Sequence, residues 1–300
     1  MPPSTPRNHL DADGFVVIRN ILTPEQVSSL RAAAERTTAL ARSGGWPHVR
    51  TVGKQFPPWD AAEAAEKGIW GVQGLNDPAL PAHAAFLRVY FGDEVLGPAA
   101  ELMACSADDD LVMELHNLLV RPDRGDFELR WHRDDIPAEA TPEEEAARLD
   151  ELHRDGYWHA QWNLALCDGD ESLVVVPGSH RRARTAAERA AGPLEPGMPG
   201  RLVVRLGAGD AVFYDNNILH RGVYDAGRER LTLHGSVGRA GPGAGRLRAR
   251  NVLQHGVGAY VDRCDFSVLD ERYRPRAEAM RARLVQLGRE SGDVGYSLTG

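Results

Sequence analysis

The sequence predicts a mainly β fold, an antiparallel sandwich or barrel flanked by helices, and three observations support it. Short apolar segments follow one another from Leu111 to about residue 240, separated by Gly, Pro and Asp turns. No strand–helix–strand alternation of the kind that builds parallel sheets interrupts them. Helical patterns lie on both sides of this region and once within it.

We expect a single domain, because 300 residues with 42% apolar content can bury one core. It should begin with a helical N-terminal part (1–110) and continue into a β core (about 111–240) that contains a helical insertion (141–155). A helical C-terminal tail (246–300) should follow.

Local signals place the individual elements. Phe15 to Ile18 is a short apolar strand, and a helix follows with Thr23 as N-cap and Gln26 as its capping-box partner. The insertion has the same arrangement with Thr141 and Glu144. The insertion is either a charged, solvated addition or a lid over a site, and the sequence leaves both interpretations open.

Charge and hydropathy exclude several kinds of partner. A formal charge of −8 and a pI near 5.8 argue against nucleic acid, which requires clustered Lys and Arg. No apolar run approaches the roughly 18 residues of a membrane span, and the first ten residues lack the apolar stretch of a signal peptide. We therefore expect a cytoplasmic monomer or homodimer that acts on a small molecule.

Residues 43–75 form an expected irregular region, because Gly and Pro interrupt every periodicity there. Its aromatic and basic side chains either bind an aromatic or anionic substrate or simply anchor the loop. These side chains are Trp46, His48, Arg50, Lys54 and Trp59.

The motif His-x-Asp occurs at 9–11, 132–134 and 153–155, and geometry separates the three copies. Residues i and i+2 share one face of a strand but diverge by about 200° in a helix. The last copy ends a predicted helix and the first precedes the first structured element. His132 and Asp134 follow a predicted strand, so they are the pair that can converge on one metal ion.

A third ligand should come from a neighbouring strand, and His220 in GDAVFYDNNILHRG is the best candidate. Two imidazoles and one carboxylate leave open positions on a metal such as iron(II). In RERLTLHG, alternation places Arg230 with Thr232 and His234 on one face. An inward-facing Arg230 would suit a carboxylate; the alternative is a surface salt bridge.

With these residues in place, the chain resembles the phytanoyl-CoA dioxygenase family of iron(II)/2-oxoglutarate oxygenases, which have a double-stranded β-helix (cupin-like jelly-roll) core. The resemblance runs from DGFVVIRNILTPEQ through WHRDD, VVVPGSH and GDAVFYDNNILHRG to RERLTLHG. The distance from His132 to His220, 88 residues (220 − 132), is similar to the family pattern.

The resemblance implies iron ligation by His132, Asp134 and His220, with 2-oxoglutarate and O2 as co-substrates. It implies that Arg230, or Arg228 in its place, binds the distal carboxylate of 2-oxoglutarate. Asn163 and Asn117 are further candidates near the co-substrate.

The resemblance predicts hydroxylation or another C–H oxidation of a small metabolite or natural-product intermediate, because related halogenases have a small residue where this chain has Asp134. Departures occur at Glu171, Ser172 and Arg221, and they bear on loop shape and substrate fit. Two alternatives remain at this stage: a cupin-like metalloenzyme that does not use 2-oxoglutarate, and a non-catalytic ligand-binding protein on the same barrel.

Overall fold

The structure is a computed structural model that describes residues 5–53, 61–243, 247 and 261–291. Its helices are α1 (Pro6–Asp13), α2 (Pro24–Arg42), α3 (Ala61–Lys67), α4 (His83–Tyr90), α5 (Asp93–Met103), α6 (Pro142–His153), α7 (Ala186–Ala190) and α9 (Arg274–Ser291). Its strands are β1 (Phe15–Ile18), β2 (Val49–Thr51), β3 (Ile69–Val72), β4 (Leu111–Val120), β5 (Phe127–Glu128), β6 (His159–Ala165), β7 (Leu173–Val175), β8 (Leu202–Val203), β9 (Ala211–Tyr214), β10 (His220–Tyr224) and β11 (Leu231–Arg239).

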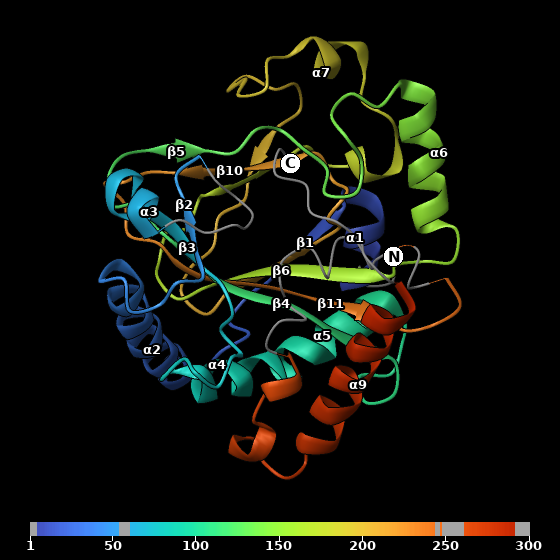
Figure 1. Ribbon diagram of the computed structural model, residues 1–300. Helices are drawn as coiled ribbons and strands as arrows, with labels where there is room; N and C mark the ends of the chain where they lie inside the picture. The colour runs from blue at the N-terminus through green and yellow to red at the C-terminus, as the bar shows by residue number, and fades with distance from the viewer. Residues whose placement is uncertain (1–4, 54–60, 244–246, 248–260, 292–300) are drawn as a thin grey trace.

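Two antiparallel sheets face one another (Figure 1). The major sheet has the order β1-β9-β6-β11-β4-β3-β2 and the minor sheet the order β5-β10-β7-β8. The chain passes between the two sheets repeatedly from β4 to β11, which is the winding of a double-stranded β-helix. The mainly β fold with flanking helices is therefore confirmed.

The two faces of the major sheet differ in chemistry. Leu233 of β11 stands beside Leu118 of β4 and Leu164 of β6, and all three join the largest apolar cluster. This cluster lies under helices α2, α4, α5 and α9, which cover one face of the sheet (Figure 1). One residue further along β11, His234 stands between Asn117 and Asn163 on the opposite face. The alternation predicted for this strand thus separates a helix-covered core from a polar interior.

Both predicted capping boxes are present. Thr23 Oγ1 accepts from the Gln26 N–H at 3.3 Å, and Gln26 Oε1 accepts from the Thr23 N–H at 2.8 Å. Thr141 and Glu144 bond in the same reciprocal way at 3.2 and 2.9 Å. Each box satisfies two backbone donors that a helix start leaves without a partner.

The expected irregular region at 43–75 contains two strands, which corrects that expectation. Arg50 of β2 pairs with Gly71 of β3, and Gly71 pairs with Leu119 of β4. The strands have only three and four residues and are flanked by Gly and Pro, so the local pattern is too short to predict them, and pairing of β3 with β4 is what orders them. Lys54 and Trp59 lie outside the described residues, as do parts of the expected C-terminal tail.

No helix in the described part of the chain has both the length and the apolar character that crossing a bilayer requires.

The VPGSH segment joins β7 to the N-terminal helix. The His180 ring is fully buried, at 0% exposure, and lies over Gly14, the C-cap of α1. Gly14 has a φ of 80°, and a Cβ there would lie 2.5 Å from His180 Nδ1. Glycine is therefore required at position 14 for two reasons: it adopts the left-handed conformation of the helix cap, and it leaves room for the imidazole of His180.

The burial of His180 predicts a loss of stability in acid. Burial lowers the pKa of His180 from 6.5 to about 4, so between these values the unfolded chain binds more protons than the folded one. The free energy of unfolding should fall by up to about 3 kcal/mol as pH drops through this window, and should not depend on His180 above it. Urea denaturation at several pH values measures this.

His180→Gln should reduce the slope of stability against pH. Some dependence of stability on pH should remain in the variant, because burial also lowers the pKa of His116, to about 3. An identical slope in the variant would contradict the assignment.

Candidate metal centre

Two segments far apart in the sequence meet at the centre. His132 and Asp134 follow β5, and His220 begins β10. The backbone N–H of each histidine donates to the carbonyl of the other, at 3.0 and 3.1 Å, and the Asp134 N–H donates to the Asn216 carbonyl at 3.0 Å. β5 is shorter than predicted, but this bridge between the histidines continues its pairing with β10. The backbone itself thus brings the three side chains together.

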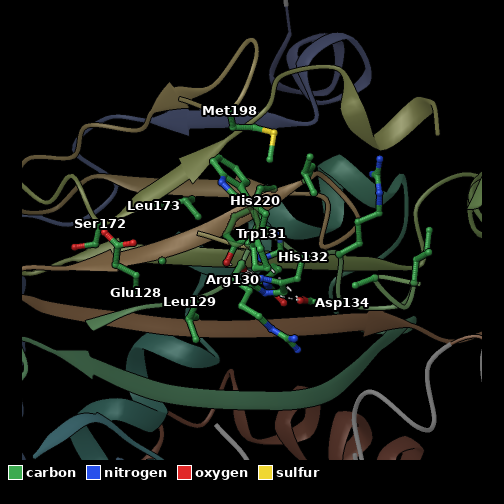
Figure 2. A pocket seen from close by; sticks show the side chains of 18 of the residues that line it. Glu128, Leu129, Arg130, Trp131, His132, Asp134, Ser172, Leu173, Met198 and His220 are labelled. Atoms are coloured by element: carbon green, nitrogen blue, oxygen red, sulfur yellow. Dashed lines mark hydrogen bonds and ion pairs between the residues drawn. The ribbon is translucent and has the colours of Figure 1, made fainter. Parts of the chain in front are cut away.

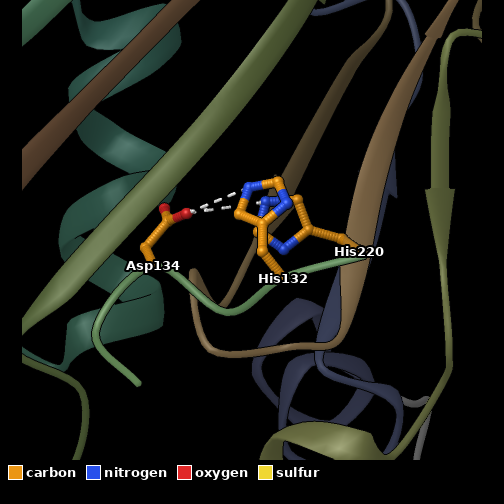
Figure 3. Close-up of side chains that lie close together, drawn as sticks. All are labelled: His132, Asp134 and His220. Carbon is orange, nitrogen blue, oxygen red and sulfur yellow. Dashed lines mark ion pairs between the residues drawn. The ribbon is translucent and has the colours of Figure 1, made fainter. Parts of the chain in front are cut away.

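The side chains converge on one point (Figure 3). Asp134 Oδ1 lies 3.5 Å from His132 Nε2 and 3.8 Å from His220 Nε2. The three possible ligand atoms lie within 4.8 Å of one another. An ion at about 2 Å from each atom fits between them after small side-chain rotations.

Backbone carbonyls orient both imidazoles. His132 Nδ1 donates to the Arg130 carbonyl at 2.7 Å, and His220 Nδ1 donates to the Ile218 carbonyl at 2.8 Å. Because Nδ1 of each ring is engaged as a donor in this arrangement, Nε2, which faces Asp134, is the nitrogen that remains to bind a metal once it is deprotonated. This is the tautomer that binds a metal.

The electrostatics suit a cation. Burial lowers the pKa of His220 to about 4, so this ring is neutral at pH 7. Burial alone would raise the pKa of Asp134, but the hydrogen bond with His132, and the positive charge that either histidine carries when it is protonated, hold this pKa well below its usual range. Burial opposes the charged form of His132, and its contact with Asp134 outweighs this and raises its pKa. The carboxylate is therefore ionised and ready to balance a metal charge.

The centre opens into a cavity of about 920 Å³ between the two sheets. Its walls include Asn163 and His234 from the major sheet and Leu173 and His220 from the minor sheet. Figure 2 shows Met198 above and Leu173 to the left of the side chains of His132 and His220. The volume is ample for a small molecule beside a co-substrate.

The structure separates the two candidate arginines. Arg230 is buried, with 5% exposure, and lines the cavity. Its guanidinium lies over the Tyr224 ring at 4.3 Å, and its Nε is 3.6 Å from Asp170 and 3.4 Å from Thr232 Oγ1. Its buried Nη1 has no hydrogen-bond partner. Arg228 is exposed and bonds to Glu171 at 3.0 Å, so Arg230 is the arginine that faces the cavity.

The two asparagines differ in position. Asn163 lines the cavity, and its Oδ1 lies 2.8 Å from His234 Nδ1. Asn117 is buried beside His234 but contacts Arg50 rather than the cavity. With its amide oriented to satisfy both neighbours, Asn117 accepts from Arg50 Nη2 at 3.2 Å.

Comparison with known families decides the relationship. The family model described as phytanoyl-CoA dioxygenase (PhyH) matches residues 10–223. The chain belongs to this family. The resemblance seen in the sequence is thereby confirmed.

Solved structures share the fold of this PhyH family member. AviO1 from Streptomyces viridochromogenes Tue57 has a TM-score of 0.54 at 21% identity, covering 79% of this chain and 96% of that chain. EctD from S. alaskensis, crystallised with 2-oxoglutarate and 5-hydroxyectoine, has a TM-score of 0.54 at 16% identity, covering 77% and 74%. The epimerase SnoN from nogalamycin biosynthesis has a TM-score of 0.50 at 19% identity, covering 78% and 79%. No curated protein sequence matches the chain.

The sequence of this PhyH family member did not predict a buried ion cluster that lies behind the candidate metal centre. Arg133 stands between the two ligands and points away from them, where its Nε donates to Glu145 of α6 at 2.6 Å. Both side chains are buried, with 2% and 0% exposure. Arg184 and Arg189 bond to the same carboxylate. The alternation that places the side chains of His132 and Asp134 on one face also predicts that Arg133 points to the opposite face. The neighbouring sequence gives no sign that Glu145 is the partner of Arg133.

The same helix holds the loop before His220. His153 Nε2 and Asp215 Oδ2 lie 2.5 Å apart. Asn216 and Asn217, next in that loop, donate to Asp135 Oδ2 at 2.8 and 3.0 Å. Buried polar contacts therefore anchor helix α6 to both segments that carry the candidate ligands. An insertion that was only solvated would lack such contacts.

Glu145→Gln should destabilise the fold strongly. Removing one partner of a buried ion pair leaves Arg133 uncompensated, so the free energy of unfolding should fall by about 3–5 kcal/mol. The matched control is Glu143→Gln, an exposed position in the same helical turn, which should change it by less than about 0.5 kcal/mol. Urea denaturation at pH 7 measures both, and equal stabilities would refute a supporting role for the cluster.

Proposed function

We propose that this chain is an iron(II)/2-oxoglutarate-dependent dioxygenase in which His132, Asp134 and His220 hold the metal. The observation that carries the proposal is one cavity that contains both a convergent two-histidine, one-carboxylate set and a buried arginine with an unsatisfied donor. Neither feature alone requires 2-oxoglutarate, but together they match a chelating co-substrate with a distal carboxylate. Family membership supports the same chemistry.

Iron(II) with 2-oxoglutarate and O2 would supply the oxidising power for a C–H bond of the substrate. The chain's own residues do the rest. The Arg130 and Ile218 carbonyls hold the imidazoles in the metal-binding tautomer. Asp134 supplies negative charge to the metal. Arg230 binds the distal carboxylate of 2-oxoglutarate, and the Tyr224 ring and Asp170 fix the orientation of its guanidinium.

The substrate is proposed to be a small metabolite or natural-product intermediate. The cavity volume supports this, and the solved neighbour SnoN is named as an epimerase crystallised with Fe3+, alpha ketoglutarate and nogalamycin RO. The carboxylate at position 134 favours hydroxylation or a related C–H oxidation over halogenation. We further propose a cytoplasmic monomer or homodimer without a nucleic-acid partner, in keeping with its charge of −8.

Anaerobic addition of iron(II) and 2-oxoglutarate should give a weak visible charge-transfer band. His132→Ala should lose the band, because the metal loses one of its three protein ligands. Absorption spectroscopy under argon measures it. An intact protein that binds iron(II) and gives no band would refute chelation by 2-oxoglutarate.

Arg230→Gln should weaken 2-oxoglutarate binding by roughly 10- to 100-fold, because a charge-assisted hydrogen bond contributes about 1.5–3 kcal/mol. Arg228→Gln is the matched control and should bind as the wild type does. Titrating the charge-transfer band with 2-oxoglutarate gives both affinities. Unchanged binding by the Arg230 variant would favour a cupin-like enzyme that does not use this co-substrate.

A further inference from the structure

A second buried guanidinium, that of Arg50, lines the same cavity. Arg50 lies on β2, and its cross-strand row continues through Gly71 of β3 and Leu119 of β4 to Thr232 of β11. The Arg50 side chain lies across Gly71, where a Cβ would be 3.2 Å from Arg50 Cδ. The missing side chain at Gly71 is what gives this arginine a path inward.

The partners of Arg50 set it apart from other buried arginines. Among the described residues, four arginines are buried, and three of them pair with carboxylates: Arg133 with Glu145 at 2.6 Å, Arg221 with Glu128 at 3.2 Å, and Arg230 with Asp170 at 3.6 Å.

No carboxylate in the described part of the chain forms a direct ion pair with Arg50, although the charge of Asp134 acts on it from a longer distance. Its Nη2 donates to Asn117 Oδ1 at 3.2 Å, and its guanidinium lies 5.3 Å from the centre of the Trp70 ring. Its Nε is buried with no hydrogen-bond partner. An amide and an aromatic face do not neutralise a guanidinium charge.

A buried charge without a counterion is costly, so chains normally pair it or keep it in water. Guanidinium groups stay protonated even when buried. Arg50 is thus 5% exposed, positively charged and open to a cavity that receives small molecules. The missing counterion is best supplied by a bound molecule. The planar fork of donors suits a carboxylate, and it also suits a phosphate.

We propose that Arg50 forms a second anion subsite of the cavity, which binds a carboxylate or phosphate group of the molecule to be oxidised. The assignment to the substrate rests on the proposed function, because there Arg230 and the metal already hold the two ends of 2-oxoglutarate. The substrate class is then an anionic small molecule, oriented by Arg50 and packed along the Trp70 ring. The Arg50 guanidinium lies over Trp70 and that of Arg230 over Tyr224, and the centres of these two rings are 5.2 Å apart.

The test compares Arg50→Gln with the wild type by isothermal titration calorimetry. Inorganic phosphate and acetate are the probes, titrated into the metal-free chain and into the chain loaded with manganese(II) and 2-oxoglutarate. Arg205→Gln is the control, because that side chain is 76% exposed and lies on the surface. We expect Arg50→Gln to weaken anion binding at least 10-fold in the loaded form and to remove one of the anion-binding events in the metal-free form, where Arg230 is also open to an anion. The control should be unchanged, and the 2-oxoglutarate affinity should stay within twofold of wild type.

Other results have equally definite meanings. If Arg50→Gln weakens 2-oxoglutarate binding 10-fold and anions do not bind the loaded wild type, the assignment to the substrate is overturned and the co-substrate is the anion. If Arg50→Gln binds every probe as the wild type does, or the wild type binds none, the subsite is refuted. Phosphate binding that depends on Arg50 in a chain that fails to bind 2-oxoglutarate would uphold the subsite while refuting the proposed function.

Thermal unfolding distinguishes a binding role from a structural one. Removing an uncompensated buried charge should leave the melting temperature of Arg50→Gln equal to or above that of the wild type. Phosphate should raise the wild-type melting temperature and not that of the variant. A melting temperature several degrees lower, together with unchanged anion binding, would mean that Arg50 is a structural residue and would overturn the proposal.

Discussion

Two backbone hydrogen bonds between His132 and His220 are the constraint on which the centre depends. They join the start of β10 to the segment after β5, and the two imidazole rings consequently stand with their centres 4.3 Å apart. Side-chain rotamers alone would not hold this geometry, since each ring would keep several orientations. The bridge keeps the side chains of His132, Asp134 and His220 on one side of the segment, so every contact that stabilises the bridge also preorganises the proposed metal site.

Much of the surrounding structure serves that bridge. The Ser179 hydroxyl accepts from the Leu219 N–H at 2.7 Å, just before His220, and the Ser179 carbonyl accepts from Arg133, just after His132. Ser179 belongs to VPGSH, so this motif acts as a clamp between the two ligand-bearing segments rather than as part of the chemistry. Helix α6 reaches the same segments from the other side through Glu145 and His153. The polar contacts are buried, which strengthens them and makes each costly to lose.

The sequence predicted what depends on local periodicity. The period of two separated His132–Asp134 from the other two copies of its motif and placed Arg230 with His234 inside the barrel. The capping boxes were readable for the same reason, because a box spans four consecutive residues. What could not be predicted depends on partners distant in sequence. A charged helix that begins PEEE looks solvated, and only the fold brings Arg133, Arg184 and Arg189 to Glu145. β2 was missed because its order comes from β3, and the position of Arg50 is visible only once Gly71 lies beside it.

The two walls of the cavity differ in what the fold requires of them. The major sheet has the main apolar core on its outer face, so its strands cannot shift without disturbing helices α4, α5 and α9. The minor sheet has only short strands and smaller clusters, and α7 and the β7–β8 connection lie beyond it. The bridge to His132 fixes the β10 side of the minor sheet, whereas β8 and the β7–β8 connection are comparatively free to change. A barrel of this kind could keep its proposed metal, co-substrate and Arg50 sites while that connection diverges to accept new molecules. Efforts to redirect its specificity beyond the anionic group therefore belong on the β7–β8 connection.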